Sequence, residues 1–185
     1  MRIVGGEFKG SHLFAPKGTG TRPTSDRVRE SLFNILSHSI DQFSIEGTRV
    51  LDLFAGTGAL GLEAISRGAA FALFVDSDPD ARGAQRDNIE ALALTGRTRL
   101  FRRDALKLGK AGNMGAFGLV FLDPPYGKGL AEKALLRALQ GGWLEPGAVI
   151  VIEESADSQF EFPQGFEQLD ERTYGSTKIH ILRAV

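Results

Sequence analysis

The chain has 185 residues, of which 42% are hydrophobic, enough for one main domain with a buried core, and its formal net charge of −1 gives no global pull toward nucleic acid. The absence of cysteine excludes disulfides, thiolate metal sites and a cysteine nucleophile, and the three scattered histidines lack metal-ligand spacing, so no metal is expected. Neither a signal-peptide core nor an apolar run of membrane-spanning length occurs, which predicts a cytoplasmic protein without a membrane partner.

Residues 1–47 are interpreted as an N-terminal extension. Ile3–Phe8 and His12–Phe14 are expected to pair as a small hairpin, and a helix is expected to begin near Ser25. An apolar face and an opposite face carrying Arg29 define that helix; the apolar residues are Val28, Leu32, Ile35 and Leu36.

Residues 1–29 hold six basic and two acidic side chains. This excess suggests an element that grips RNA, or covers a cofactor, rather than part of the core. The candidate phosphate contacts are Arg22, Arg27 and Arg29. A solvated helix face is the alternative for these arginines.

From residue 48 to 185, β-rich runs alternate with segments of helical period, which predicts βα units and a mostly parallel sheet. Strands are expected near 49–54, 71–76, 98–103, 117–123 and 148–153, and helices over 59–67, 79–93 and 129–140. A turn is predicted over Trp143–Gly147, and two last strands, 166–174 and 177–184, are expected to form an antiparallel hairpin at the sheet edge.

Gly56–Gly61 has the spacing GxGxxG directly after the first of these strands, which fits a dinucleotide site as well as a methyltransferase. Asp52, inside the strand, favours S-adenosylmethionine, because a carboxylate repels a pyrophosphate and attracts a sulfonium and an ammonium group. A structural cap is the other role open to Asp52.

Asp76 ends the second strand, where such folds place an acid for the ribose hydroxyls. Asp104 and Ala105 follow the third strand and could contact the adenine amino group, although a helix cap is an alternative for Asp104. The candidate cofactor residues are Asp52, Phe54, Ala55, Gly56, Thr57, Gly58, Asp76, Ser77, Asp104 and Ala105.

Asp123-Pro124-Pro125-Tyr126 follows the apolar fourth strand and therefore lies at the same carboxyl edge. The two prolines fix the backbone and remove two N–H donors, which leaves the Asp123 side chain and the Pro124 carbonyl to accept hydrogen bonds from an amino group. Tyr126 could stack on a base, an interaction worth about 1–3 kcal/mol. These four residues are the candidate catalytic set.

These motifs resemble the RsmD-type family of 16S ribosomal RNA guanine-N2 methyltransferases over nearly the whole chain. The segments that carry the resemblance are Arg2–Gly6 with Lys9-Gly10, Arg22–Thr24 with Asp26–Glu30 and Leu32–Asn34, Asp52–Ala64 and Asp123–Tyr126, with a looser match at Tyr174–Ile179. The resemblance implies a class I methyltransferase domain at 48–185 with a seven-stranded sheet and S-adenosylmethionine as the cofactor. It also implies methylation of the exocyclic amine of the guanine at nucleotide 966, in 16S ribosomal RNA within an assembling small subunit. The protein is expected to be a monomer.

The mechanism we expect is direct in-line displacement on a flipped base, without a metal or a covalent enzyme intermediate. Two other functions stay open from the sequence. A DNA adenine-N6 methyltransferase could use the same tetrapeptide, but no target-recognition domain is evident; a non-catalytic RNA-binding assembly factor could keep the fold, but the intact acids and prolines argue against it.

Overall fold

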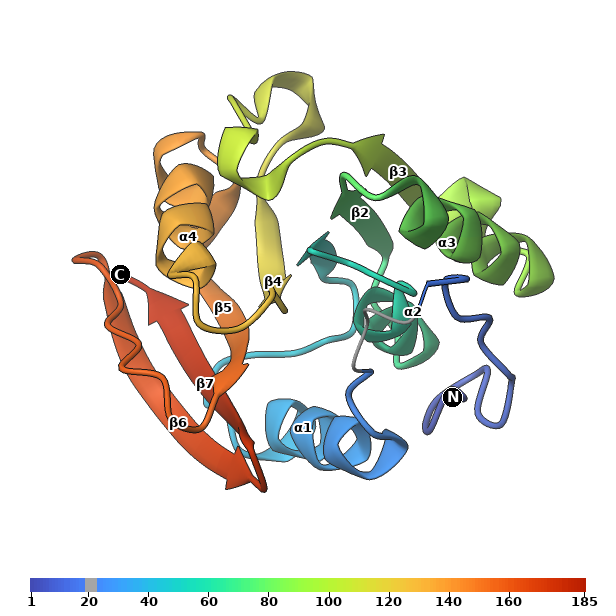
Figure 1. The fold of residues 1–185 in the computed structure, drawn as a ribbon, viewed down its shortest axis with the longest axis horizontal. Helices are drawn as coiled ribbons and strands as arrows, with labels where there is room; N and C mark the ends of the chain where they lie inside the picture. Colours follow the sequence, from blue (N-terminus) through green and yellow to red (C-terminus); the bar gives the residue numbers. More distant parts are fainter. Residues whose placement is uncertain (19–22) are drawn as a thin grey trace.

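A seven-stranded sheet runs through the computed structural model, which describes residues 1–18 and 23–185 (Figure 1). The strand order is β3-β2-β1-β4-β5-β7-β6. The strands are β1 Arg49–Leu53, β2 Phe71–Asp76, β3 Thr98–Arg102, β4 Phe117–Leu122, β5 Leu144–Ser155, β6 Phe166–Tyr174 and β7 Thr177–Ala184. β1 to β5 pair in parallel, while β7 is antiparallel to both β5 and β6, so the predicted mostly parallel sheet with a hairpin at its edge is confirmed.

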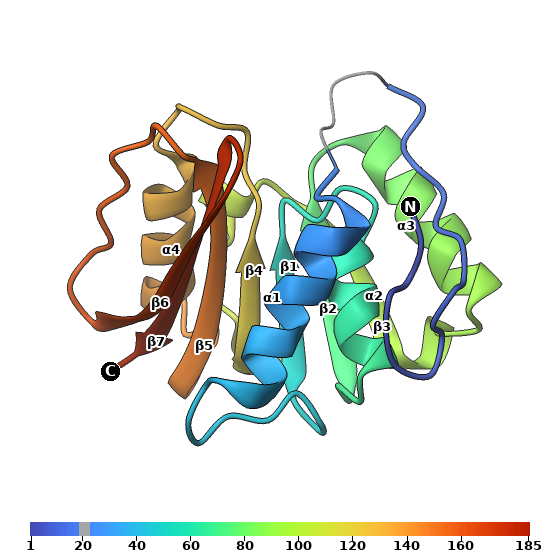
Figure 2. The same cartoon turned by 90° about the horizontal axis from the view of Figure 1, so that it is seen from below.

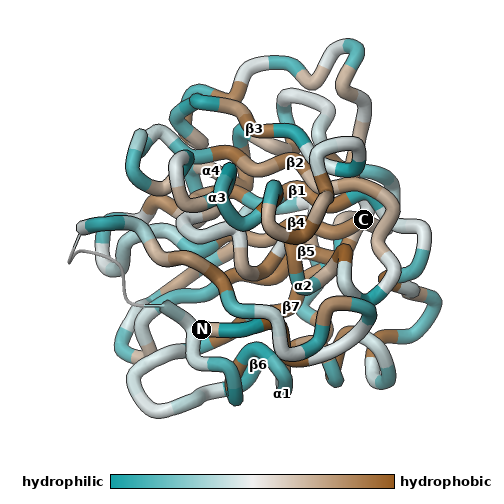
Figure 3. Tube along the Cα trace, turned by 90° about the vertical axis from the view of Figure 1, so that its right-hand side faces the viewer, coloured by the Kyte–Doolittle hydropathy of each residue, from teal (hydrophilic) through white to brown (hydrophobic). Residues whose placement is uncertain are grey.

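Helices cover both faces of this sheet (Figure 2). They are α1 Asp26–His38, α2 Ala59–Ser66, α3 Pro79–Ala91 and α4 Leu130–Gln140, and three short 3₁₀ turns lie at Thr95–Arg97, Ala105–Lys107 and Gly112–Met114. α1, α2 and α3 contribute to one hydrophobic cluster and α4 to another. The strands feed both clusters because their side chains alternate between faces, as Val50 and Leu51 do. In Figure 3 the hydrophobic segments accordingly gather on the central strands.

The start of β5 differs from the prediction. Residues 144–147, expected in a turn, belong to the strand. A register shift explains this, because Phe117 of β4 pairs with Leu144 whereas Leu119 pairs with Val149. The extra residues of β5, including Pro146 and Gly147, are accommodated in that irregularity, so their turn-like composition marks a bulge and not the end of a strand.

The N-terminal hairpin is reduced to a single bridge between Arg2 and His12, supported by a few backbone hydrogen bonds. The extension does take part in the core. Ile3 and Leu13 are buried in the same cluster as Val50 of β1, which corrects the expectation that this segment stands outside the core.

The buried face of α1 also differs from the prediction. Ser25 caps the helix by accepting a hydrogen bond from the Val28 amide, as the predicted start requires. The fully buried positions are Arg29, Leu32, Phe33 and Leu36, whereas Val28 and Ile35 are only partly buried. The inward stripe is therefore rotated by about one residue relative to the predicted one, and it includes Arg29.

Across residues 1–18 and 23–185, no helix is both long and apolar enough to cross a membrane.

Candidate active site

The predicted cofactor turn, Phe54–Gly58, connects β1 to α2, and three side chains form hydrogen bonds to its backbone. The Asp76 carboxylate accepts a hydrogen bond from the Gly56 amide at 2.9 Å, and Gln85 Nε2 donates to the Gly56 carbonyl at 2.9 Å. Asn88 Nδ2 donates to the Thr57 carbonyl at 3.0 Å. Because both α3 residues and the end of β2 bond to it, the turn is fixed in one conformation.

Its outer side is open. Apart from Gly56 and its two chain neighbours, no heavy atom of the described residues lies within 4 Å of where a Cβ on Gly56 would stand, and the backbone there is left-handed, with a φ of 55°. Phe54 also has a positive φ, 57°, which is unusual for a residue with a side chain. Thus the backbone of this turn can be approached closely by a ligand, which is what a cofactor cradle requires.

Asp52 performs the structural role that the sequence left as the less favoured one. Its Oδ2 accepts a hydrogen bond from the Gly61 amide at 3.0 Å, in the first turn of α2, and the residue is 1% exposed. Burial above all, together with the Asp76 charge, raises the pKa of Asp52, although the bond from Gly61 opposes the rise. Asp52 therefore orients the glycine helix, and its direct contact with a cofactor stays a prediction.

The other predicted cofactor residues lie at the carboxyl edge. Asp76 accepts from the amides of Gly56 and Asp78 and stays partly exposed, next to the exposed Ser77. Since a carboxylate has about four acceptor positions, Asp76 keeps capacity for ribose hydroxyls. Asp104 caps the 3₁₀ turn that begins with the buried Ala105, by accepting from the Leu106 amide at 2.9 Å. The helix-cap alternative for Asp104 is thus observed, and an adenine contact would be an additional role.

The tetrapeptide Asp123–Tyr126 leaves β4 at the same edge, with Pro124 buried and Pro125 exposed. Burial raises the pKa of Asp123 well above its usual range, and the carboxylates of Glu153, Asp52 and Glu154 raise it further. Several acids therefore converge on one site. Such a site suits a ligand that presents hydrogen-bond donors.

Tyr126 points toward β5 and β7. Its hydroxyl donates to Glu153 Oε1 at 2.7 Å and lies 3.2 Å from Thr177 Oγ1. Burial above all raises the pKa of this hydroxyl, so Tyr126 stays protonated at neutral pH. The Tyr126 side chain therefore links the tetrapeptide loop to Glu153 of β5 and lies next to Thr177 of β7.

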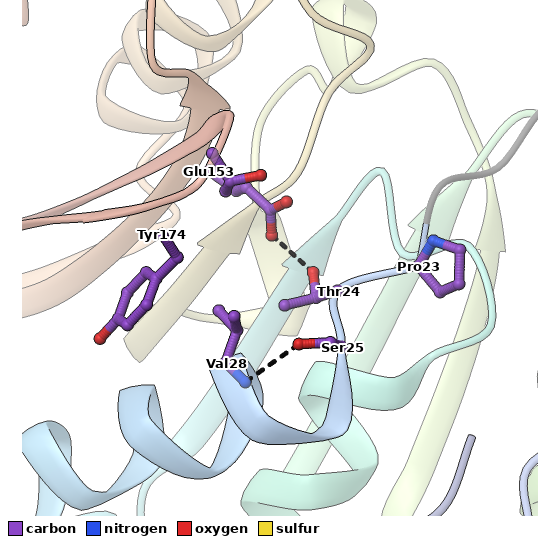
Figure 4. Close-up of a pocket in the computed structure, with 7 residues that line it drawn as sticks. Pro23, Thr24, Ser25, Val28, Glu153 and Tyr174 are labelled. Atoms are coloured by element: carbon purple, nitrogen blue, oxygen red, sulfur yellow. Dashed lines mark hydrogen bonds between the residues drawn. The ribbon is translucent and has the colours of Figure 1, made fainter.

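A pocket of about 140 Å³ lies next to the Glu153 carboxylate, which forms part of its lining (Figure 4). Its lining comes from the start of α1, from β5 and from the β6–β7 hairpin: Pro23, Thr24, Ser25, Val28, Glu153, Tyr174 and Thr177. Thr24 Oγ1 donates to Glu153 Oε2 at 2.5 Å, as the dashed line in Figure 4 marks. The N-terminal extension thus closes a space beside the tetrapeptide.

Glu153 is the site residue that the sequence reasoning missed, and a signal was available. It follows the apolar run 149–152 near the carboxyl end of a parallel strand. That is the same placement that singled out Asp76 and Asp123. Although the acidic Glu154 and Asp157 follow it closely in the sequence, Glu153 is only 6% exposed.

The three predicted RNA-binding arginines have different outcomes. Arg22 lies outside the described residues, and Arg27 is exposed on α1, where a phosphate contact is possible. Arg29 is fully buried, so its proposed phosphate contact is wrong. Its guanidinium bonds to the Arg2 carbonyl and pairs with Asp26 at 2.9 Å and Glu63 at 3.6 Å.

Comparisons with known proteins agree on one kind of relative. A family model described as "Conserved hypothetical protein 95" matches residues 1–183. The chain is 40% identical to "Putative rRNA methyltransferase YlbH" of Bacillus subtilis, over 99% of this chain and 98% of that protein. It is 35% identical to "Ribosomal RNA small subunit methyltransferase D" of Haemophilus influenzae, over 95% and 89% of the two chains.

A solved structure, "Putative methyltransferase yhhF from Escherichia coli", superimposes with a TM-score of 0.86 at 34% identity, covering 100% of this chain and 97% of the other. Together with the strand order, this match confirms the predicted class I methyltransferase fold.

Proposed function

The chain belongs to the family described as conserved hypothetical protein 95, the RsmD/YlbH family, and from this premise we propose that it methylates the exocyclic N2 amine of a guanine in small-subunit ribosomal RNA. The methyl donor is S-adenosylmethionine, which supplies an electrophilic methyl group on a sulfonium. The observation that carries the proposal is the position of Asp123–Tyr126, at the carboxyl end of β4 and beside the glycine turn of β1.

The residues of the turn fit this cofactor. The open backbone at Gly56 admits a ligand, and Asp76 has acceptor capacity for ribose hydroxyls. Acids dominate this edge, which favours a cationic ligand over a pyrophosphate. Asp52 contributes to that preference through its position under the turn.

Asp123 and the Pro124 carbonyl are proposed to accept hydrogen bonds from the two N–H groups of the target amine. Such bonds would orient the nitrogen lone pair toward the methyl group, and positioning of this kind can lower the barrier of a displacement reaction by about 7–11 kcal/mol. No strong base is required, because the proton becomes acidic only as the nitrogen is methylated. The side chain of Tyr126 would stack on the flipped base.

The proposal extends to the target and the setting. The relatives of Haemophilus influenzae and Escherichia coli, which are 35% and 38% identical to this chain, are named small-subunit ribosomal RNA methyltransferases, and the Bacillus subtilis relative is named a putative rRNA methyltransferase. The proposed substrate is therefore 16S ribosomal RNA in an assembling small subunit, with the guanine at nucleotide 966 as the first candidate. The protein is proposed to act in the cytoplasm as a monomer, with residues 1–47 as a cover for RNA or cofactor.

The test is to incubate the protein and tritiated cofactor with methylation-deficient small subunits and, separately, with duplex DNA, and then to map the methylated nucleotide. We expect the tritiated methyl group to be incorporated at one guanine of the small-subunit RNA. Ribosomal RNA from cells that lack the gene should carry no methyl group at that guanine. Methylation of adenine in duplex DNA would replace this proposal with the DNA alternative. Failure of the protein to bind cofactor in a calorimetric titration would favour a non-catalytic RNA-binding factor.

A further inference from the structure

Glu153 is a buried carboxylate, and within residues 1–18 and 23–185 its two oxygens accept only from hydroxyl groups of neighbouring segments. Oε1 accepts from Tyr126 at 2.7 Å and Oε2 from Thr24 at 2.5 Å, while only 6% of the residue is exposed. A buried carboxylate needs such donors, since burial without them is costly. No arginine or lysine among the described residues pairs with Glu153, and within that part of the chain its carboxylate accepts from hydroxyl groups alone.

Both donors are replaceable by a ligand. Thr24 lies just before α1 and Tyr126 lies on the loop after β4, so neither belongs to a helix or strand. Thr24 lines the pocket together with Glu153, Tyr174 and Thr177. The Tyr126 hydroxyl group is not part of that lining, but it lies 3.2 Å from Thr177 Oγ1. A base that enters beside Tyr126 would displace these hydroxyl groups, and it would have to bring N–H donors of its own to leave Glu153 satisfied.

We propose that Glu153 selects guanine by accepting the N1–H of the target base, while Asp123 and the Pro124 carbonyl hold its N2 amine. This inference rests on the function proposed above and adds the residue that reads the base. Guanine presents N1–H and the 2-amino group side by side, two adjacent donors for two nearby carboxylates. Adenine presents an acceptor, N1, beside its amine, so the Glu153 carboxylate would face a lone pair and lose both hydroxyl donors.

The proximity of Asp123 and Glu153 supports this pairing. Leu122 of β4 pairs with Ile152 of β5, so the residues that follow, Asp123 and Glu153, leave neighbouring parallel strands at the same edge. In agreement with this placement, the charge of Glu153 is the second cause, after burial, of the raised pKa of Asp123. Two like charges in one buried site destabilise each other unless donors compensate them. A guanine edge supplies adjacent donors for both, and no other standard base does so at one edge with a free exocyclic amine.

The test uses 2-aminopurine in place of the methylated guanine, in small subunits reconstituted from ligated ribosomal RNA. This base keeps the 2-amino group that accepts the methyl, but its N1 is an acceptor. We expect wild-type protein to methylate guanine far faster than 2-aminopurine, because sites that bind a donor reject analogues lacking it. Glu153→Gln offers an amide that can turn to donate to N1, so its guanine preference in kcat/KM should fall by about tenfold or more.

Glu154→Gln is the matched control. Glu154 is 2% exposed and adjacent in β5, but it points to the other face of the sheet, where it accepts from the amides of Ser155 and Gly127. Its variant should keep the wild-type preference for guanine over 2-aminopurine, whatever happens to its absolute rate.

Two results would overturn the inference. One is wild-type protein that methylates 2-aminopurine as fast as guanine, a measurement that needs no variant and so does not depend on how Glu153→Gln folds. The other is an unchanged preference in a folded Glu153→Gln protein. If wild-type protein methylates no guanine at all in the unmodified subunits, the proposed function fails instead, so the two failures are distinguishable.

Discussion

Arg29 and Arg27 lie two positions apart on α1, and the structure predicts opposite consequences for their loss. Arg29 is fully buried and pairs with Glu63, which is also fully buried. Arg27 is exposed. We therefore expect Arg29→Met to destabilise the fold without a direct effect on RNA contacts. We expect Arg27→Met to weaken an RNA contact and to leave the stability of the fold nearly unchanged.

The expected loss of stability in Arg29→Met depends on the partners that the Glu63 carboxylate retains. Removing one partner of a buried ion pair costs about 3–5 kcal/mol, because the other charge is left buried. Glu63 retains Arg67 at 2.9 Å and the Val4 amide at 3.0 Å, so we expect the lower end, about 3 kcal/mol. The loss at Asp26 adds little, because its side chain is 40% exposed. For a chain of this size, about 3 kcal/mol corresponds to a Tm lower by roughly 6–12 °C.

Two assays separate the arginines. Urea unfolding measures stability, where Arg27→Met should stay within about 0.5 kcal/mol of wild type. The salt dependence of binding to small subunits measures phosphate contacts: its logarithmic slope should fall by roughly 0.7–0.9 in Arg27→Met if Arg27 neutralises one phosphate, and stay unchanged in Arg29→Met. An Arg29→Met protein as stable as wild type, with a reduced salt slope, would refute the buried role and restore Arg29 as an RNA contact.

Four further predictions concern the site. Asp76→Ala should weaken cofactor binding by about 1.5–3 kcal/mol, measured by calorimetry; unchanged affinity would place the ribose contact elsewhere. Asp123→Ala should remove most turnover and leave cofactor affinity within a few fold, and a matched loss of affinity would contradict an aligning role. Tyr126→Phe should be mild and Tyr126→Ala severe in kcat/KM; an equally inactive Phe variant would show that the hydroxyl and not the ring is required. Because Asp123 must be ionised to accept hydrogen bonds from the amine, activity should fall as pH drops through the raised pKa of Asp123. Glu153→Gln removes a neighbouring negative charge, so in this variant the fall in activity should occur at lower pH. If it occurs at the same pH as in wild type, the titrating group is not Asp123.

The sheet could be predicted from sequence because its strands are short apolar runs separated by glycines and helical periods. The carboxyl-edge site followed from the same pattern, since parallel strands bring Asp76 and Asp123 to one edge wherever their helices lie. Local rules also sufficed for the start of α1, where Ser25 caps the helix by accepting from the Val28 amide.

Contacts between distant segments could not be predicted in this way. Arg29 looked solvent-exposed because its buried partner, Glu63, is 34 residues away on α2. Likewise, no periodicity indicates that Thr24 will donate to Glu153, a pair 129 residues apart. In both cases a charged residue is buried because a second segment supplies the donor or the opposite charge, and that information exists only in the tertiary structure.

These distant contacts share one element, the N-terminal extension, and together they bear on what it does. The Val4 amide donates to Glu63 of α2, and the Phe14 amide donates to the side chain of Asn88. The side chain of Asn88 in turn donates to the Thr57 carbonyl of the cofactor turn. Thr24 contacts Glu153 in the proposed base pocket. A rearrangement of the extension therefore changes hydrogen bonds at the cofactor turn and at the base pocket simultaneously. This is why an RNA-binding role for the extension and a cofactor-covering role need not be alternatives: the same segment bonds to residues of both sites.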